Sequence, residues 1–201
     1  MKSVVIVVVL LLTATFVFAQ VDDNGAEYRE FWSKTEAEFK NQEESPLPKN
    51  EISDFDSIPK YLYDPKFRVE ARWEERKYEK PFKIETSDSR KVMYQKVAVL
   101  HFKIGEDSLQ LAAYQSLDLM RSPAYKDYIF LPYTDETNGF DTYGGGRYID
   151  FEKPESDTST VILDFNMSYN PYCAYNDGYS CPIPPRENNL NIKIEAGARY
   201  D

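Results

Sequence analysis

The chain has 201 residues, which is enough for one domain of ordinary size with its own core and short for two. It carries 34 acidic and 24 basic side chains, a net charge of −10 at pH 7. Because a chain this acidic repels phosphate backbones and anionic lipid surfaces, we expect no nucleic-acid partner.

The first 19 residues are typical of a signal peptide. A basic residue precedes the apolar run 4–14, and Val17 and Ala19 supply the small side chains expected before a cleavage site. A membrane anchor is the alternative, but a spanning helix needs about 20 apolar residues, and polar residues begin at Gln20. We therefore expect cleavage after Ala19, export to the periplasm or the medium, and no stable membrane insertion afterwards.

The following segment, residues 20–45, has the pattern of one amphipathic helix. Apolar and aromatic side chains recur at helical spacing on one face: Tyr28, Phe31, Trp32, Thr35 and Phe39. Pro46 ends the pattern, because the residue before a proline is disfavoured in a helix. Such a stripe could dock a partner or a membrane surface, but packing against the chain's own domain is commoner, and we expect that arrangement.

Residues 46–201 have the pattern of a β-rich domain that forms one globular unit with the helix. Short segments with strand-like composition or alternation are separated by turn residues: Phe67–Trp73, Tyr78–Thr86, Val92–Ile104, Ser108–Leu117, Tyr128–Tyr133, Arg147–Glu152, Thr158–Phe165 and Leu190–Ala196. No long helical pattern lies between them. The sequence therefore predicts a mainly β fold on the border of α+β: an antiparallel sandwich or small barrel of seven to eight strands with one N-terminal helix.

Familiar catalytic motifs are absent from the sequence. It has no Gly-x-Ser-x-Gly elbow, no His-Glu-x-x-His zinc helix, no phosphate-binding loop and no dinucleotide fingerprint. His101 is the only histidine and lies in a predicted strand, where a hydrogen-bonded structural imidazole is commoner than a catalytic one. We expect neither a metal nor a cofactor.

The stretch "TYGGGRYID", residues 142–150, predicts either an anion site or a turn. It contains three successive glycines: Gly144, Gly145 and Gly146. Glycines allow left-handed backbone angles and could present a row of amide donors beside Arg147, which could grip a carboxylate or phosphate. The alternative is a turn in which Arg147 pairs with Asp150 or Asp164.

Two blocks, "LPYTDETNGFDTYGGGRYID" and "DFNMSYNPYCAYNDGYSCPIPPRENNLNIKIEAG", together resemble the C-terminal signature of family 1684 of the domains of unknown function. The resemblance covers most of the chain after residue 19 and is strong from Leu131 to Gly197. The family implies no activity. Two positions depart from its pattern, Tyr172 and Ala198, where a proline and an acidic residue are usual.

The second block contains the only two cysteines, Cys173 and Cys181. In an exported chain this pair predicts a disulfide across a short loop, worth roughly 2 to 3 kcal/mol. Proteins resembling this one without export signals also carry the pair, which a purely structural staple does not explain. Buried thiols without a bond and a functional thiol site therefore stay open as alternatives.

The two blocks also supply the residues of a candidate ligand site. Asp164, Asn166 and Ser168 alternate with apolar or aromatic residues, so a continuing strand would bring them to one face, near Arg147 and Glu187. A concave site of this composition suits a sugar, a carboxylate or a phosphate. The candidate ligand-binding residues are Tyr143, Gly144, Gly145, Gly146, Arg147, Asp164, Asn166, Tyr169, Asn170 and Glu187. A buried network that fixes the loops is the alternative.

Two functions follow from these patterns. The preferred one is an exported, soluble module that binds a small polar ligand. The other is a hydrolase-like enzyme in which Glu187 or Asp164 is the general base and Arg147 with the glycines stabilises an anion. A raised carboxylate pKa in a closed pocket would favour the enzyme, and an open tyrosine-lined groove would favour binding.

Overall fold

The computed structural model describes residues 24–155 and 160–200. The expected signal peptide, the first residues of the expected helix, and positions 158–159 of one expected strand lie outside these ranges. Helix α1 spans Asn24–Lys40 and so ends earlier than expected. It ends because the Asn41 side chain accepts a hydrogen bond from the Glu43 amide at 2.9 Å, which favours a turn over another helical residue.

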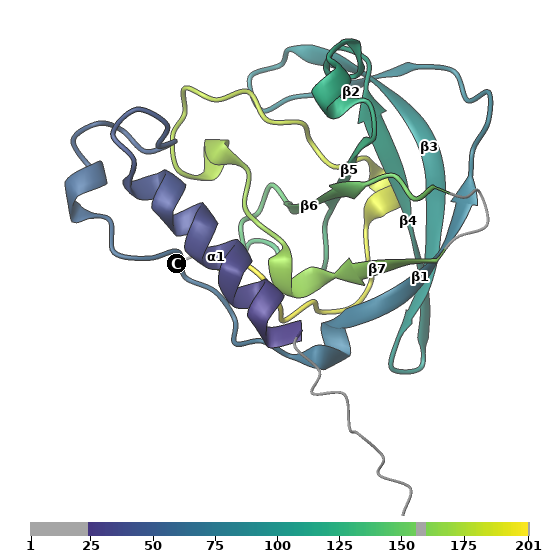
Figure 1. Cartoon of the computed structure of the whole chain (residues 1–201), viewed down its shortest axis with the longest axis horizontal. Coiled ribbons are helices and arrows are strands. Elements are labelled where there is room, and N and C mark those ends of the chain that lie inside the picture. Colours follow the sequence, from purple (N-terminus) through teal and green to yellow (C-terminus); the bar gives the residue numbers. More distant parts are fainter. Residues whose placement is uncertain (1–23, 156–159, 201) are drawn as a thin grey trace, which may run out of the picture.

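Seven antiparallel strands form one curled, half-barrel sheet (Figure 1), so the expectation of a mainly β fold with one N-terminal helix is confirmed. The path runs β6-β5-β4-β3-β1-β7, and β2 pairs with β3 off this path. The strands are β1 Arg68–Glu75, β2 Phe82–Glu85, β3 Lys91–Ile104, β4 Asp107–Ser116, β5 Tyr128–Tyr133, β6 Arg147–Glu152 and β7 Thr160–Asp164.

Alternation along the strands divides the sheet into two faces. The inner face supplies the main core, with Trp73, Leu100, Leu111, Leu131 and Leu163 all buried. The curl brings the chain after β7 to the opposite edge strand, β6. There Tyr148 and Tyr169 exchange both backbone hydrogen bonds at 3.0 Å, and this single bridge links the two edges of the sheet.

Helix α1 packs on the domain through its aromatic face, as expected. Trp32 and Phe39 are buried, and the Trp32 indole donates to the Asn166 carbonyl at 3.1 Å. In Figure 1, α1 lies on the side of β6 and β7, away from β3 and β4. The helix therefore covers part of the outer aromatic face of the sheet, where Phe130 and Tyr148 belong to a second apolar cluster.

The expectation of a strand over Leu190–Ala196 is wrong. Leu190, Ile194 and Ala196 are buried, but the segment has no partner strand among the described residues. Its carbonyl groups instead accept hydrogen bonds from the Arg147 guanidinium, at 2.9 Å for Ile194. The segment also pairs briefly with residues 134–136, because the Leu190 amide donates to the Thr134 carbonyl at 2.8 Å and the Glu136 amide donates to the Ile192 carbonyl at 3.1 Å. The Arg147 side chain and this short backbone pairing thus replace a full neighbouring strand, which the alternating pattern of residues 190–196 does not reveal.

Candidate functional site

Arg147 lies inside the fold and does not face an open anion site. Its side chain is fully buried, and Nη2 donates to Asp135 Oδ2 at 2.7 Å. The other guanidinium bonds go to the carbonyls of Ile194, Ala196 and Ala198. The expected pairing with Asp150 or Asp164 is therefore corrected to Asp135, and Arg147 is not presented to a ligand.

The three glycines form a turn. Gly146 donates its amide to the Tyr143 carbonyl at 3.1 Å, and of the three only Gly146 has a left-handed backbone, with φ of 90°. A Cβ at this position would lie 2.6 Å from the Tyr133 carbonyl oxygen. Gly144 and Gly145 are exposed. The turn interpretation therefore fits the geometry better than an anion nest.

Asp164 and Asn166 belong to a buried hydrogen-bond network. β7 ends at Asp164, and the chain enters a 3-10 helix, so the expected continuing strand is not formed. Asp164 Oδ1 accepts from the Asn166 amide at 2.9 Å and its side chain at 2.8 Å. The Asn166 side chain also binds the backbone of Asp64: its Oδ1 accepts from the Asp64 amide at 2.9 Å, and its Nδ2 donates to the Asp64 carbonyl at 3.0 Å. Burial raises the pKa of Asp164, opposed by the Asn166 donors and Arg68.

Glu187 forms no hydrogen bond or ion pair with Arg147 or Asp164 in the described part of the chain, and its carboxylate has other partners. Its carboxylate accepts from Lys96 at 2.6 Å and from the Tyr114 hydroxyl at 2.7 Å. Burial works to raise the pKa of Glu187, but the hydrogen bonds from Lys96 and Tyr114 outweigh it, and the net shift is downward. A carboxylate held ionised in this way is a weak general base, which counts against its expected catalytic role.

Two of the expected ligand residues, Tyr169 and Asn170, line a pocket of about 490 Å³ between α1, the outer face of β5 and β6, and the segment 169–182. Its size is within the usual range for small-molecule sites. Seven tyrosines and three phenylalanines line it: Tyr94, Tyr128, Tyr148, Tyr169, Tyr172, Tyr175, Tyr179, Phe31, Phe39 and Phe130.

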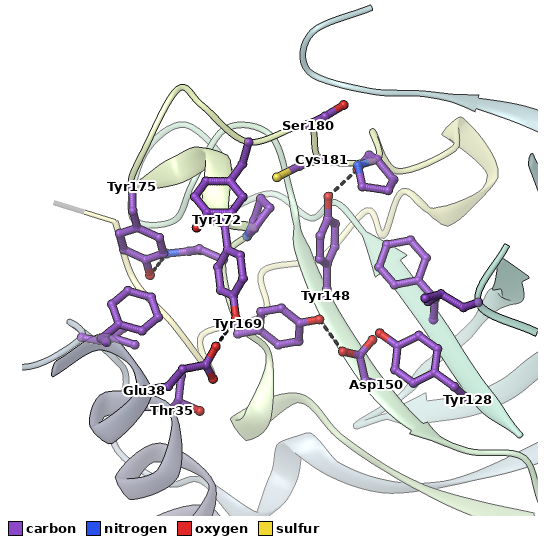
Figure 2. Close-up of a pocket in the computed structure, with 18 of the residues that line it drawn as sticks. Thr35, Glu38, Tyr128, Tyr148, Asp150, Tyr169, Tyr172, Tyr175, Ser180 and Cys181 are labelled. Carbon is purple, nitrogen blue, oxygen red and sulfur yellow. Dashed lines mark hydrogen bonds between the residues drawn. The ribbon is translucent and has the colours of Figure 1, made fainter. Parts of the chain in front are cut away.

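Asp150 provides the carboxylate on the sheet wall of this pocket. Tyr128 and Tyr169 lie on either side of it and both donate hydrogen bonds to it, as Figure 2 shows for Tyr169. Solvent reaches Asp150 through the pocket, yet protein atoms surround it closely. This desolvation raises the pKa of Asp150 to about 6, despite the two phenol donors, which favour the charged form.

The helix wall carries a second carboxylate, Glu38. The Tyr172 hydroxyl donates to Glu38 Oε1 at 2.5 Å (Figure 2). Burial raises the pKa of Tyr172, and likewise of Tyr128 and Tyr169, so these phenols remain protonated donors at neutral pH. The pocket thus has an acidic side chain on each of two walls with phenol hydroxyls between them.

Asn170 adds an amide group to the pocket wall. Its side chain is 2 % exposed, and its Nδ2 donates to the Arg199 carbonyl at 3.0 Å and the Tyr175 hydroxyl at 3.2 Å. Its Oδ1 accepts no hydrogen bond from the described part of the chain. This oxygen has essentially no solvent-accessible surface, so it is not offered to a ligand in the pocket.

Cys173 and Cys181 are neighbours, but no disulfide joins them, contrary to expectation. The Cys173 amide donates to Cys181 Sγ at 3.1 Å, and the Tyr143 hydroxyl lies 3.8 Å from Cys173 Sγ. The hydrogen bond from the Cys181 thiol lowers the pKa of Cys173 and raises that of Cys181 itself. Cys181 also lines the pocket, which places the pair at its edge.

His101 has the structural role expected for it. Its Nε2 lies 2.9 Å from Glu74 Oε2 on the neighbouring strand β1. Within residues 24–155 and 160–200, no group of three or more His, Cys, Asp or Glu side chains could hold a metal ion.

Most residues of the pocket were not predicted from the sequence, among them Asp150, Glu38, Tyr128 and Tyr172. A signal was present in "RYIDFE", where Tyr148 and Asp150 alternate with the buried Ile149. The same alternation in the preceding strand puts Tyr128 and Phe130 on that outer face. An aromatic face next to a carboxylate could therefore have been inferred, but not the helix that covers it.

Comparisons with known proteins place the chain without assigning an activity. A family model described as "Protein of unknown function (DUF1684)" matches residues 53–199. A search of functionally curated proteins gave no match. Among solved structures, the solution NMR structure of an uncharacterized protein of Haloarcula marismortui is similar, with 36% identity and a TM-score of 0.68. The match covers 88% of this chain and 94% of that one. In the described part of this chain, no helix is long and apolar enough to span a membrane.

Proposed function

Because the chain belongs to the DUF1684 family of proteins of unknown function, whose name assigns no activity, we propose a function from the pocket itself. The protein is a binding module for a small polar molecule, and its site is the tyrosine-lined pocket between α1 and strands β5 and β6. The observation that carries the proposal is the convergence of Tyr128, Tyr169 and Asp150 on the sheet wall of that pocket.

The composition of the pocket narrows the expected ligand classes. Aromatic rings offer apolar surface, while phenol hydroxyls and two carboxylates fix orientation through hydrogen bonds. Among the residues that the structure describes, no lysine, arginine or histidine lines it. A carboxylate or phosphate ligand would meet Asp150 and Glu38 without a compensating cation, so the anionic classes considered from the sequence are disfavoured, and neutral or cationic ligands are favoured.

An enzyme is the second candidate, and the raised pKa of Asp150 is the observation that favours it. A carboxylate with a pKa near 6 suits general acid or base chemistry near neutral pH. In the described part of the chain, however, Asp150 forms no hydrogen bond with a serine, threonine or cysteine side chain. The Ser180 hydroxyl, which lines the pocket, is hydrogen-bonded to Asp88 Oδ1 at 2.5 Å, and the hydrogen bond with Cys173 raises the pKa of the lining Cys181 thiol. The binding function therefore has the stronger support.

Ligand-shift thermal denaturation tests the binding proposal. Sugars, ammonium compounds, carboxylates and phosphates are added to the wild type, to Thr35→Trp and to Ser33→Trp. Thr35 lines the pocket from α1, whereas Ser33 is exposed on the same helix and does not. A ligand at about 100 times its Kd adds about 2.7 kcal/mol to the free energy of unfolding.

We expect a neutral or cationic compound to raise the melting temperature of the wild type and of Ser33→Trp, but not of Thr35→Trp. If no compound acts, or if both tryptophan variants respond like the wild type, the pocket is not a ligand site.

Export is a separate part of the proposal, supported by the basic residue and apolar run that precede Ala19. The test is N-terminal sequencing of the protein recovered from each cellular fraction. A protein outside the cytoplasm that begins at Gln20 would support export. A cytoplasmic protein that still carries residues 1–19 would contradict it.

A further inference from the structure

We propose that the ligand of this pocket is an organic cation, an ammonium compound whose charge is balanced by Asp150 and Glu38 and whose substituents pack against the tyrosine rings. This inference rests on the proposed binding function and gives it a ligand class. It is carried by the charges that line the pocket, by their lack of basic partners and by the arrangement of the rings.

The carboxylates of the pocket lack cationic partners. Asp150 accepts hydrogen bonds from two phenols, and Glu38 accepts one from Tyr172. Neither forms an ion pair with a basic side chain in residues 24–155 and 160–200, whereas Glu36 on the same helix as Glu38 pairs with Lys60 at 2.5 Å. A cation bound in the pocket would supply the counter-charge that the described residues do not give to these carboxylates.

The aromatic side chains surround this charge with π surfaces. Tyr148 packs edge-to-face with Phe130 at a centroid distance of 4.7 Å and with Tyr169 at 5.8 Å. Perpendicular rings of this kind present ring faces in several directions, and ring faces attract ammonium groups. Aromatic side chains that line a site together with a carboxylate are the arrangement by which proteins recognise substituted ammonium ions.

Hydrogen-bond geometry points to the same class. The carboxylates of Asp150 and Glu38 are acceptors that line the pocket, and an ammonium N–H or a neighbouring hydroxyl is a donor. A neutral sugar could use the phenols and these acceptors, but it would leave the charge of Asp150 unbalanced. The net charge of −10 also attracts cations toward the molecule as a whole.

The test compares choline with its neutral isostere 3,3-dimethylbutan-1-ol, because the two have nearly the same shape and differ in charge. Affinities are measured by calorimetric titration for the wild type, Asp150→Asn and Glu38→Gln. Asp127→Asn is the matched control, since Asp127 is an exposed carboxylate that does not line this pocket. Glu38→Gln is the second test variant because Glu38 lies on α1, where loss of its charge leaves the sheet unchanged.

We expect the wild type and Asp127→Asn to bind choline at least about ten-fold more tightly than the neutral isostere. In Asp150→Asn and in Glu38→Gln that preference should fall. Equal affinities of the wild type for the two compounds would overturn the cation class and leave the binding function standing. The cation class would also be overturned if choline does not bind while a neutral sugar binds to the wild type and not to Thr35→Trp. The absence of binding by any class of compound would overturn both.

Discussion

Asp135 and Arg147 form an ion pair inside the protein, with Arg147 Nη2 2.7 Å from Asp135 Oδ2 and both side chains essentially inaccessible to solvent. The pair also organises the C-terminal segment. Asp135 Oδ1 accepts from the Ile194 amide at 3.2 Å, while Arg147 donates to the carbonyls of Ile194, Ala196 and Ala198. The two side chains therefore hold residues 194–198 in place together with two backbone hydrogen bonds, from the Ala198 amide to the Ser168 carbonyl and from the Tyr61 amide to the Gly197 carbonyl.

Breaking this pair should destabilise the fold strongly. In Arg147→Met, Asp135 becomes a buried charge without a partner and three carbonyls lose their donor, so we expect the free energy of unfolding to fall by about 3 to 5 kcal/mol. Urea denaturation measures this loss of unfolding free energy. Arg121→Met is the control, because Arg121 is exposed and pairs only with Asp118. Equal stability of the two variants would show that the pair does not hold the segment.

The glycine turn allows a comparison within three residues. Gly146→Ala places a Cβ 2.6 Å from the Tyr133 carbonyl oxygen at a φ of 90°, so we expect a loss of about 2 kcal/mol or more. Gly144→Ala meets nothing closer than 3.7 Å and should change stability by less than about 0.5 kcal/mol. Thermal unfolding of both variants tests the difference, and a strongly destabilised Gly144→Ala would argue for a role of the exposed glycine.

The sequence predicts the strands well and the candidate site poorly, for a physical reason. Strand positions follow from local alternation, which is why β5 and β6 have the expected bounds. The pocket depends on the placement of α1 over the outer face, set by long-range contacts such as that between Trp32 and Asn166. The glycines and arginine of residues 144–147 have the composition of an anion site, and only the fold reveals that the partner of Arg147 is Asp135.

Asp150 should give stability a specific pH dependence. Its pKa in the folded protein is about 6, above the ordinary value of 3.8, so the folded state binds more protons between these values. Its contribution to stability is therefore largest at low pH and falls as pH rises from about 4 to about 6. The difference in unfolding free energy between wild type and Asp150→Asn, measured by urea denaturation from pH 4 to pH 8, should decrease over that range. A constant difference would contradict the raised pKa.

The reactivity of Cys173 should depend on Cys181. Because the hydrogen bond from the Cys181 thiol lowers the pKa of Cys173, its alkylation rate should reach half-maximum below the ordinary thiol value of about 8.5. In Cys181→Ala the midpoint should move upward. Mass spectrometry of reduced protein treated with iodoacetamide measures the extent of alkylation at Cys173 directly. The same midpoint in both proteins would mean that Cys181 does not activate its neighbour.

The most direct test of the central claim is an isotope-filtered NOE spectrum of the protein with the compound that gives the largest rise in melting temperature. A ligand held between α1 and β6 should show contacts to the rings of Tyr128 and Tyr169 on the sheet wall and of Tyr172 facing the helix. Contacts confined to other surfaces, such as the exposed Tyr78, or no contacts to these three rings, would contradict the account.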